Sequence, residues 1–134
     1  MDIIHDDYQV HYDTATATVI CQGSFRLRGT EEYAPILQVL TAAADAKPAT
    51  LTLDLRTLRF LNSSGINTLA KFVLHVRQFP ATQVVLKGSH HIPWQEKSLK
   101  NFPRLLPGRS SLLIWMHLSF YLLINQRFAV ILAE

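Results

Sequence analysis

Two adjacent serines followed by a glycine, Ser63-Ser64-Gly65, are the residues of this 134-residue chain whose types and spacing most directly suggest chemistry. A serine hydroxyl can cap free backbone N–H groups at the start of a helix and stabilise it by about 1 kcal/mol. One serine is enough for that role, so the second hydroxyl is left to face solvent. A phosphate on it would meet the positive end of the helix dipole, with Arg56 and Arg59 near in sequence to offer charge-assisted hydrogen bonds.

Other chemistries find less support in the sequence. The serines lie in no Gly-X-Ser-X-Gly elbow and in no recognisable triad order, which argues against a hydrolase. The five glycines are isolated, so no glycine-rich phosphate loop or dinucleotide motif is present. His90 and His91 are adjacent and lack a neighbouring cluster of cysteines or carboxylates, so we expect no metal site. The sequence therefore favours a binding protein over an enzyme, and we expect no cofactor.

Composition indicates one globular domain with a core of its own. Hydrophobic residues make up 49% of the chain and charged residues 17%, which excludes a disordered protein. The single cysteine, Cys21, cannot form an internal disulfide, and the first residues lack the basic start and long apolar core of a signal peptide. We therefore expect a cytoplasmic location.

Charge is distributed unevenly along the chain. Residues 1–54 hold three basic and eight acidic side chains, a net charge of −5, whereas residues 55–134 hold ten basic and two acidic ones, a net charge of +8. The bases are scattered singly, without the runs or interleaved aromatic residues of a nucleic-acid surface. We therefore expect a protein partner and no nucleic acid.

The elements that must position the serines can be predicted in order. Residues 8–12 and 16–21 are short β-prone runs that suit an antiparallel hairpin. Residues 31–45 have helical spacing, and because Pro35 is tolerated only in a first turn, the helix is expected to begin near residues 31–33.

The second half of the pattern contains the serines. Residues 51–55 alternate with period two and predict a central strand, followed by a loop. Residues 64–78 predict an amphipathic helix whose buried face carries Ile66, Leu69, Ala70 and Val73. Residues 83–87 predict a further strand and residues 94–101 a short helix. The strand-helix-strand units predict an α/β fold: a mixed sheet of four to five strands with two to three main helices.

The apolar C-terminal tail differs from the rest of the chain. We place a boundary between a domain of residues 1–108 and an extension of residues 109–134. The apolar run 112–124 is too short to span a bilayer, which needs about 20 apolar residues. We expect a closing strand and a terminal element packed on the core or on another subunit, which would form a homo-oligomer through the tail. Membrane association and an altered reading frame are the alternatives.

Several segments together resemble a known family. The sequence Leu53-Asp54-Leu55, then Phe60-Leu61, then Ser63-Ser64-Gly65 with Ile66 and Leu69, is similar to the signature of STAS domains, the fold of anti-sigma-factor antagonists. Residues 92–101, which read Ile-Pro-Trp-Gln-Glu-Lys-Ser-Leu-Lys-Asn, are similar to a cyanobacterial subgroup of that family. The resemblance covers roughly the first 106 residues and leaves the tail outside.

The resemblance implies a STAS-like fold and a partner-switching cycle. A serine kinase of the anti-sigma type would phosphorylate Ser63, and a phosphatase would remove the phosphate. The family pattern commonly has Asp where this chain has Asn62. The alternative function is a constitutive STAS-type binding module for a protein or small ligand, without phosphorylation. In either case the expected partner-binding residues are Arg59, Asn62, Ser63, Ser64, Gly65, Asn67 and Lys71.

Overall fold

The computed structural model describes residues 1–99, 111–115 and 119–124. An antiparallel hairpin of β2 (Tyr8–Asp13) and β3 (Thr18–Phe25) opens the fold, and the short strand β1 (Asp2–Ile4) pairs with the outer edge of β2. Period-two alternation buries one row of hairpin side chains, including Val10 and its partner Cys21. The predicted hairpin is confirmed, with longer strands than expected, whereas β1 was not predicted.

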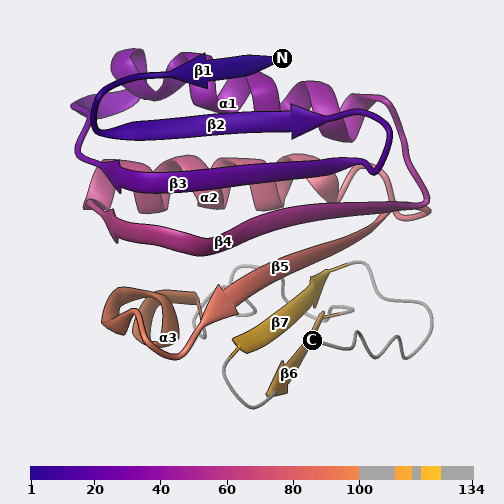
Figure 1. Ribbon diagram of the computed structural model, residues 1–134. Helices are drawn as coiled ribbons and strands as arrows, with labels where there is room; N and C mark the ends of the chain where they lie inside the picture. Colours follow the sequence, from indigo (N-terminus) through magenta and orange to yellow (C-terminus); the bar gives the residue numbers. More distant parts are fainter. Residues whose placement is uncertain (100–110, 116–118, 125–134) are drawn as a thin grey trace.

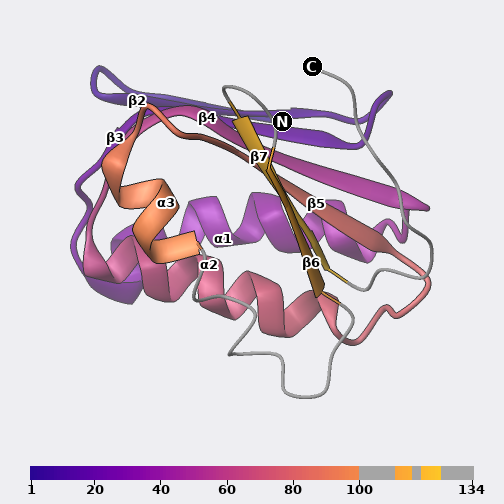
Figure 2. The same cartoon turned by 90° about the horizontal axis from the view of Figure 1, so that it is seen from below.

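Three parallel strands form the centre of the sheet. β3, β4 (Thr50–Leu61) and β5 (Gln83–Ser89) run in the same direction and are joined by α1 (Gly29–Asp45) and α2 (Ser63–Val76). Both helices lie on one face of the sheet, and α2 runs alongside α1 (Figures 1 and 2). The predicted strand-helix-strand units and the α/β class with a mixed sheet and three helices are therefore confirmed.

The strand β4 corrects one expectation. It does not end at residue 55 in a loop but continues to Leu61, accompanied by register shifts against β3 between Ile20 and Gln22 and between Gly23 and Ser24. These shifts interrupt the period-two pattern that a continuous strand would show. The serines therefore follow the end of a long strand directly.

The start of α1 corrects another expectation. The helix begins at Gly29, before residues 31–33, so Pro35 lies beyond the first turn. Two hydrogen bonds hold this early turn: the Glu32 carboxylate accepts from the Arg28 N–H at 2.8 Å, and Ser64 Oγ accepts from the Gly29 N–H at 3.3 Å. Pro35 cannot donate a backbone hydrogen bond inside the helix. The two hydrogen bonds and the packing of α1 nevertheless hold the turn that begins at Gly29, so the helix starts before the position that Pro35 alone would predict.

The core lies between the helices and the covered face of the sheet. Leu51, Leu53 and Leu55 of β4 are almost completely buried there. On α2, the prediction is correct for Leu69 and Val73, but Ile66 and Ala70 are only half-buried. The helix turns a slightly different face inward, and its buried residues are Gly65, Thr68, Leu69, Phe72, Val73 and Val76.

The tail adds two strands to the edge of the sheet. β7 (Ser119–Ile124) pairs antiparallel with β5, and β6 (Ser111–Trp115) pairs with β7, so the strand order is β1-β2-β3-β4-β5-β7-β6. β1 to β5 lie within residues 1–99, and the closing strand expected of the tail is present as β7. The predicted terminal element after residue 124 falls outside the described residues. Within the described ranges, no helix is long and apolar enough to cross a membrane.

Candidate functional site

The first turn of α2 is capped by Asn62. Asn62 has an extended backbone, with φ −87° and ψ 178°, and its Oδ1 accepts a hydrogen bond from the Gly65 N–H at 2.9 Å. This is the geometry of an N-cap, in which a side-chain oxygen satisfies a free N–H group of the first turn. The expectation that Ser63 or Ser64 caps α2 is therefore wrong, and Ser64 Oγ accepts instead from the Gly29 N–H in the first turn of α1.

The amide of Asn62 also ties the start of α2 to the loop before α1. Its Oδ1 accepts a second hydrogen bond, from the Tyr33 hydroxyl at 2.6 Å, and its Nδ2 donates to the Leu27 carbonyl at 2.7 Å. Burial raises the pKa of Tyr33 to about 12, so the phenol stays a donor at neutral pH. An ionised aspartate could accept these bonds but could not donate to Leu27. The local geometry thus uses both the oxygen and the nitrogen of the Asn62 side-chain amide.

Gly65 is required by close packing. A Cβ atom at this position would overlap the Leu61 side chain and approach the Tyr33 hydroxyl to 2.9 Å. Leu61 is the last residue of β4, and Tyr33 is fully buried in α1. The glycine therefore lets the first turn of α2 sit directly on the end of its own strand and on the neighbouring helix.

The two serines occupy different environments. Ser64 is half-buried, and its Oγ accepts from the Gly29 N–H, which links the first turns of α1 and α2. Ser63 is the first residue of α2 and is exposed to solvent. Its hydroxyl lies outside the capping network of Asn62. Of the two serines, Ser63 is the one that an enzyme could reach without opening the fold.

Asn67 and Lys71 continue the surface along α2. They follow Ser63 by one and two turns on the same face of the helix, and both are exposed. Lys71 Nζ lies 3.5 Å from the Thr30 Oγ1, which brings its ammonium group beside the first turn of α1. The structure therefore places Asn67 and Lys71 in line with Ser63 on α2.

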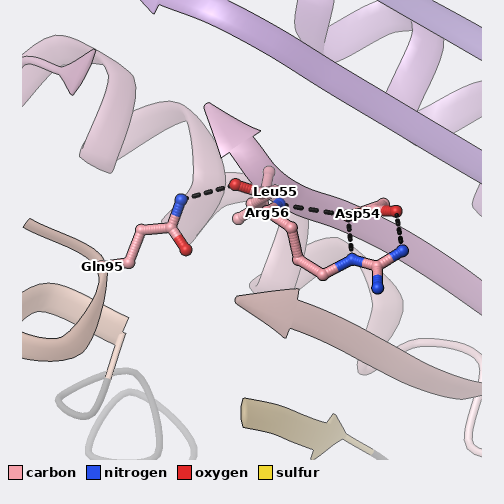
Figure 3. A network of polar contacts seen from close by, with 4 residues as sticks. All are labelled: Asp54, Leu55, Arg56 and Gln95. Atoms are coloured by element: carbon pink, nitrogen blue, oxygen red, sulfur yellow. Dashed lines mark hydrogen bonds and ion pairs between the residues drawn. The ribbon is translucent and has the colours of Figure 1, made fainter. Parts of the chain in front are cut away.

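The two arginines expected near Ser63 lie elsewhere. Arg56 forms a two-point ion pair with Asp54, with Nε–Oδ1 and Nη2–Oδ2 distances of 3.1 and 2.9 Å (Figure 3). Arg59 is exposed and lines a hollow of about 330 Å³ with residues of the His5 to Gln9 segment and the ends of β3 and β4. Neither side chain is directed to Ser63 by a contact among the described residues.

Electrostatics around Arg56 favour the ionised pair. Burial alone would raise the pKa of Asp54, but the hydrogen bonds and charge of Arg56, together with Lys87, bring that pKa below its ordinary value of 3.8. Asp54 therefore remains a carboxylate and holds the Arg56 guanidinium. The hydrogen bond that Arg56 was expected to give a phosphate is already given to this carboxylate.

The exposure of Phe60, an aromatic residue close in sequence to the serines, was not predicted from the sequence. Phe60, near the end of β4, keeps 40% of its surface exposed, and the Arg26 guanidinium carbon lies 4.8 Å from its ring centroid. Phe60 pairs with Ser24 of β3 after a register shift. Because the shift breaks the alternation of β4, the pattern does not show which residues near Leu61 face outward. The only signal in the sequence is an aromatic residue close to the serine pair.

Gln95 was also missed, and it supports the strand that carries the site. Its side chain is completely buried, donates to the Leu55 and Leu58 carbonyls and accepts from the Ser89 N–H at 2.8 Å. Figure 3 shows Gln95 reaching from α3 (Pro93–Leu99) to β4. The indole of Trp94 also donates to Leu58, at 3.0 Å. These bonds satisfy β4 carbonyls beyond its last pairs with β5.

Comparisons with known proteins give no family for the chain: no protein-family model, no curated protein and no solved structure matches it. Within the part of the chain that the structure describes, no group of three or more His, Cys, Asp or Glu residues is placed to hold a metal ion. Cys21 is buried, and burial raises the pKa of its thiol to about 12, so this thiol is not a reactive thiolate at neutral pH. Among the described residues of the site, Ser63 thus offers an exposed hydroxyl at the start of α2.

Proposed function

We propose that this chain is a regulatory protein-protein interaction module of the anti-sigma-factor antagonist type, which binds a partner through the surface around Ser63 and is released when Ser63 is phosphorylated. One observation carries the proposal. Ser63 is exposed at the first residue of α2, while the neighbouring Asn62 supplies the helix cap. A phosphate can therefore be added to Ser63 without removing a bond that holds the helix start.

The fold and the sequence resemblance support the same function. The segment from β4 to α2 carries the residues that resemble the STAS signature, and it lies in an α/β fold with a mixed sheet. The proposed partners are a serine kinase of the anti-sigma type, which binds and phosphorylates the module, and a phosphatase that restores binding. The cycle is expected to take place in the cytoplasm.

Phosphorylation acts on binding more than on folding in this proposal. A phosphoserine carries a charge of about −1.5 to −2 at neutral pH. The N-terminus of α2 offers a favourable electrostatic environment for that charge, so the fold is retained. At a docking surface the same group must lose its water or face groups on the partner, so the affinity falls.

Intact-mass measurement with peptide mapping tests the modification. The protein is purified from its native host, and separately it is incubated with ATP and the serine kinase that co-purifies with it. We expect the mass of one phosphoryl group, mapped to Ser63, and no addition in the Ser63→Ala variant. If a partner binds but no phosphate is found under either condition, the module binds constitutively and the switch is wrong.

A further inference from the structure

A polar hollow of about 330 Å³ lies on the face of the sheet that α1 and α2 leave uncovered. Alternation along the strands identifies this face: Tyr8 and Cys21 are buried in the core, so the exposed Gln9 and Gln22 beside them point to the other side. Thr57 of β4 is the register partner of Gln22. The polar side chains that line the hollow include Asp6, Asp7, Gln9, Gln22, Thr57 and Arg59. Its volume is that of a site for a small molecule.

The turn between β1 and β2 forms one side of the hollow, at the edge where β3 and β4 have their carboxyl ends (Figure 1). The His5 N–H donates to the Tyr8 carbonyl, and the Ser24 N–H donates to the Asp7 carbonyl, each at 2.9 Å. Gly23, with φ +90°, permits this close approach, because a Cβ atom there would collide with the Asp7 carbonyl oxygen. These contacts fix the turn, and the acidic residues on it, against the end of β3.

Arg59 supplies a cation on the opposite side of the hollow. Leu58 of β4 pairs with Gly23, and the next pair along β3 joins Ser24 to Phe60. Arg59 is therefore an extra residue of β4, a β-bulge of the kind that redirects a side chain. Its side chain is exposed and lines the hollow. Because β3 lies between β2 and β4, the acidic turn and Arg59 are on opposite sides of β3.

The charged groups of the hollow are free to bind a ligand. Among the described residues, neither the Arg59 guanidinium nor the carboxylates of Asp6 and Asp7 form a hydrogen bond or an ion pair. The ring of His5, which also lines the hollow, stacks on Tyr8 with a centroid distance of 4.8 Å. The hollow therefore presents unpaired charges of both signs.

The neighbouring charged groups of this face have contacts of their own. Asp54 holds Arg56 in the two-point ion pair, and Lys87 is the register partner of Asp54 on β5. Arg26 stacks on an aromatic ring of β4. A ligand in the hollow therefore meets negative charge at the β1–β2 turn and positive charge on β4.

We propose that the hollow binds a small zwitterion, with its ammonium group at Asp6 and Asp7 and its carboxylate at Arg59. A guanidinium binds a carboxylate through two parallel hydrogen bonds, and the amide and hydroxyl groups between the two sides can donate or accept further ones. β2 and β4 are two strand spacings apart, about 9 to 10 Å, and the aspartate and arginine side chains narrow this gap to the length of a short ω-amino acid. The site does not depend on Ser63, so the proposal stands apart from the proposed function.

Nuclear magnetic resonance titration of the isotope-labelled full chain tests the proposal. The probes are glycine, γ-aminobutyrate and ε-aminohexanoate, which place the same two charges at increasing separations. Butyrate and butylamine, which carry one charge each, are the controls. We expect at least one of the three zwitterions to shift the amide resonances of residues 5–9, 22–23 and 57–59, with an affinity at least about fivefold higher than that of either control.

Variants of the two charged sides identify the groups that bind. Arg59→Gln, and separately Asp6→Asn combined with Asp7→Asn, are each expected to weaken binding of the zwitterion at least about tenfold. Glu31→Gln and Arg77→Gln change exposed charges that do not line the hollow, and they should alter the affinity less than about twofold. Amide spectra that are unchanged away from each substitution show that the variants keep the fold.

Three results would overturn the proposal. The first is that none of the zwitterions shifts these resonances at concentrations up to about 20 mM. The second is that butyrate or butylamine binds as tightly as γ-aminobutyrate and ε-aminohexanoate, which would show a site for a single charge. The third is that the variants of the hollow bind the zwitterion like the unaltered chain, which would place the ligand elsewhere.

Discussion

Asn62 shows how much of the site depends on one side chain. Its amide accepts from Gly65 and Tyr33 and donates to Leu27, so it joins α2, α1 and the loop between β3 and α1. Asparagine and aspartate are about equal as helix caps when only acceptance matters. Here the donated bond distinguishes them, because a carboxylate would face the Leu27 carbonyl oxygen without a proton between them.

Two substitutions of Asn62 should therefore separate its role as the helix cap from its hydrogen bond to the Leu27 carbonyl. Asn62→Asp keeps both accepted bonds and is expected to lower the free energy of unfolding by about 1 kcal/mol, the value of the lost donor. Asn62→Ala removes all three bonds and should cost about 2 kcal/mol or more. Urea unfolding at neutral pH measures both. An Asn62→Asp protein as stable as the original would show that the Leu27 bond does not contribute.

The ion pair of Asp54 and Arg56 predicts a pH dependence. Because the folded state lowers the pKa of Asp54 below 3.8, the pair stabilises the fold above that pH and the contribution is lost as pH falls through the folded-state pKa. Asp54→Asn removes the pair and is expected to cost about 1 kcal/mol at pH 7. Chemical unfolding from pH 7 to pH 2 should show the difference between the two proteins narrowing. A constant difference would mean that Asp54 ionisation is not linked to folding.

At the scale of elements, α2 combines a buried face with an exposed face that carries Ser63, Asn67 and Lys71. Leu69 is 3% exposed and packs in the core, whereas Lys71 projects from the opposite side of the helix. Substitutions on the two faces are therefore expected to have independent effects on the free energy of unfolding. Changes on the outer face are therefore expected to leave the core intact.

A pair of substitutions on α2 tests that separation. Leu69→Asp buries an unpaired charge and is expected to cost more than about 4 kcal/mol, enough to unfold the domain. Lys71→Asp changes an exposed side chain and should alter stability by no more than about 0.5 kcal/mol. Thermal melts followed by circular dichroism compare them. Equal melting temperatures for the two proteins would contradict the observed orientation of α2.

The sequence predicted those features that depend on local periodicity. The alternation of Leu51, Leu53 and Leu55 identified the central strand, and the serine pair located the start of α2. The exposed Phe60 could not be predicted, because register shifts within β4 break the period that assigns residues to faces. Gln95 could not be predicted either, since its partner Leu55 lies 40 positions away and only the folded chain brings the two together.

At the scale of the whole molecule, the sheet has one face covered by α1 and α2 and an edge completed by the tail (Figure 2). β5 lies between β4 and β7, and its residues Val84, Val85 and Leu86 are completely buried. Without β7, the outer edge of β5 would expose unpaired backbone groups beside this apolar segment. The tail is therefore expected to stabilise the same sheet whose strand β4 leads into α2 and Ser63.

Truncation after Pro107 tests the role of the tail. The shortened chain loses β6 and β7, and we expect lower stability and self-association through the uncovered edge of β5. Urea unfolding and sedimentation velocity measure the two effects. A truncated protein that stays monomeric and equally stable would show that the tail is dispensable.

The central claim is that phosphate on Ser63 controls binding, and the affinity of the co-purified partner for defined phosphorylation states tests it most directly. The partner is titrated with the unmodified chain, the chain phosphorylated at Ser63, Ser63→Asp and Ser63→Ala. We expect phosphorylation to weaken binding at least about tenfold, Ser63→Asp to weaken it less because it has a smaller charge and fewer acceptors, and Ser63→Ala to bind like the unmodified chain. Equal affinity of the phosphorylated and unmodified chains would contradict the claim.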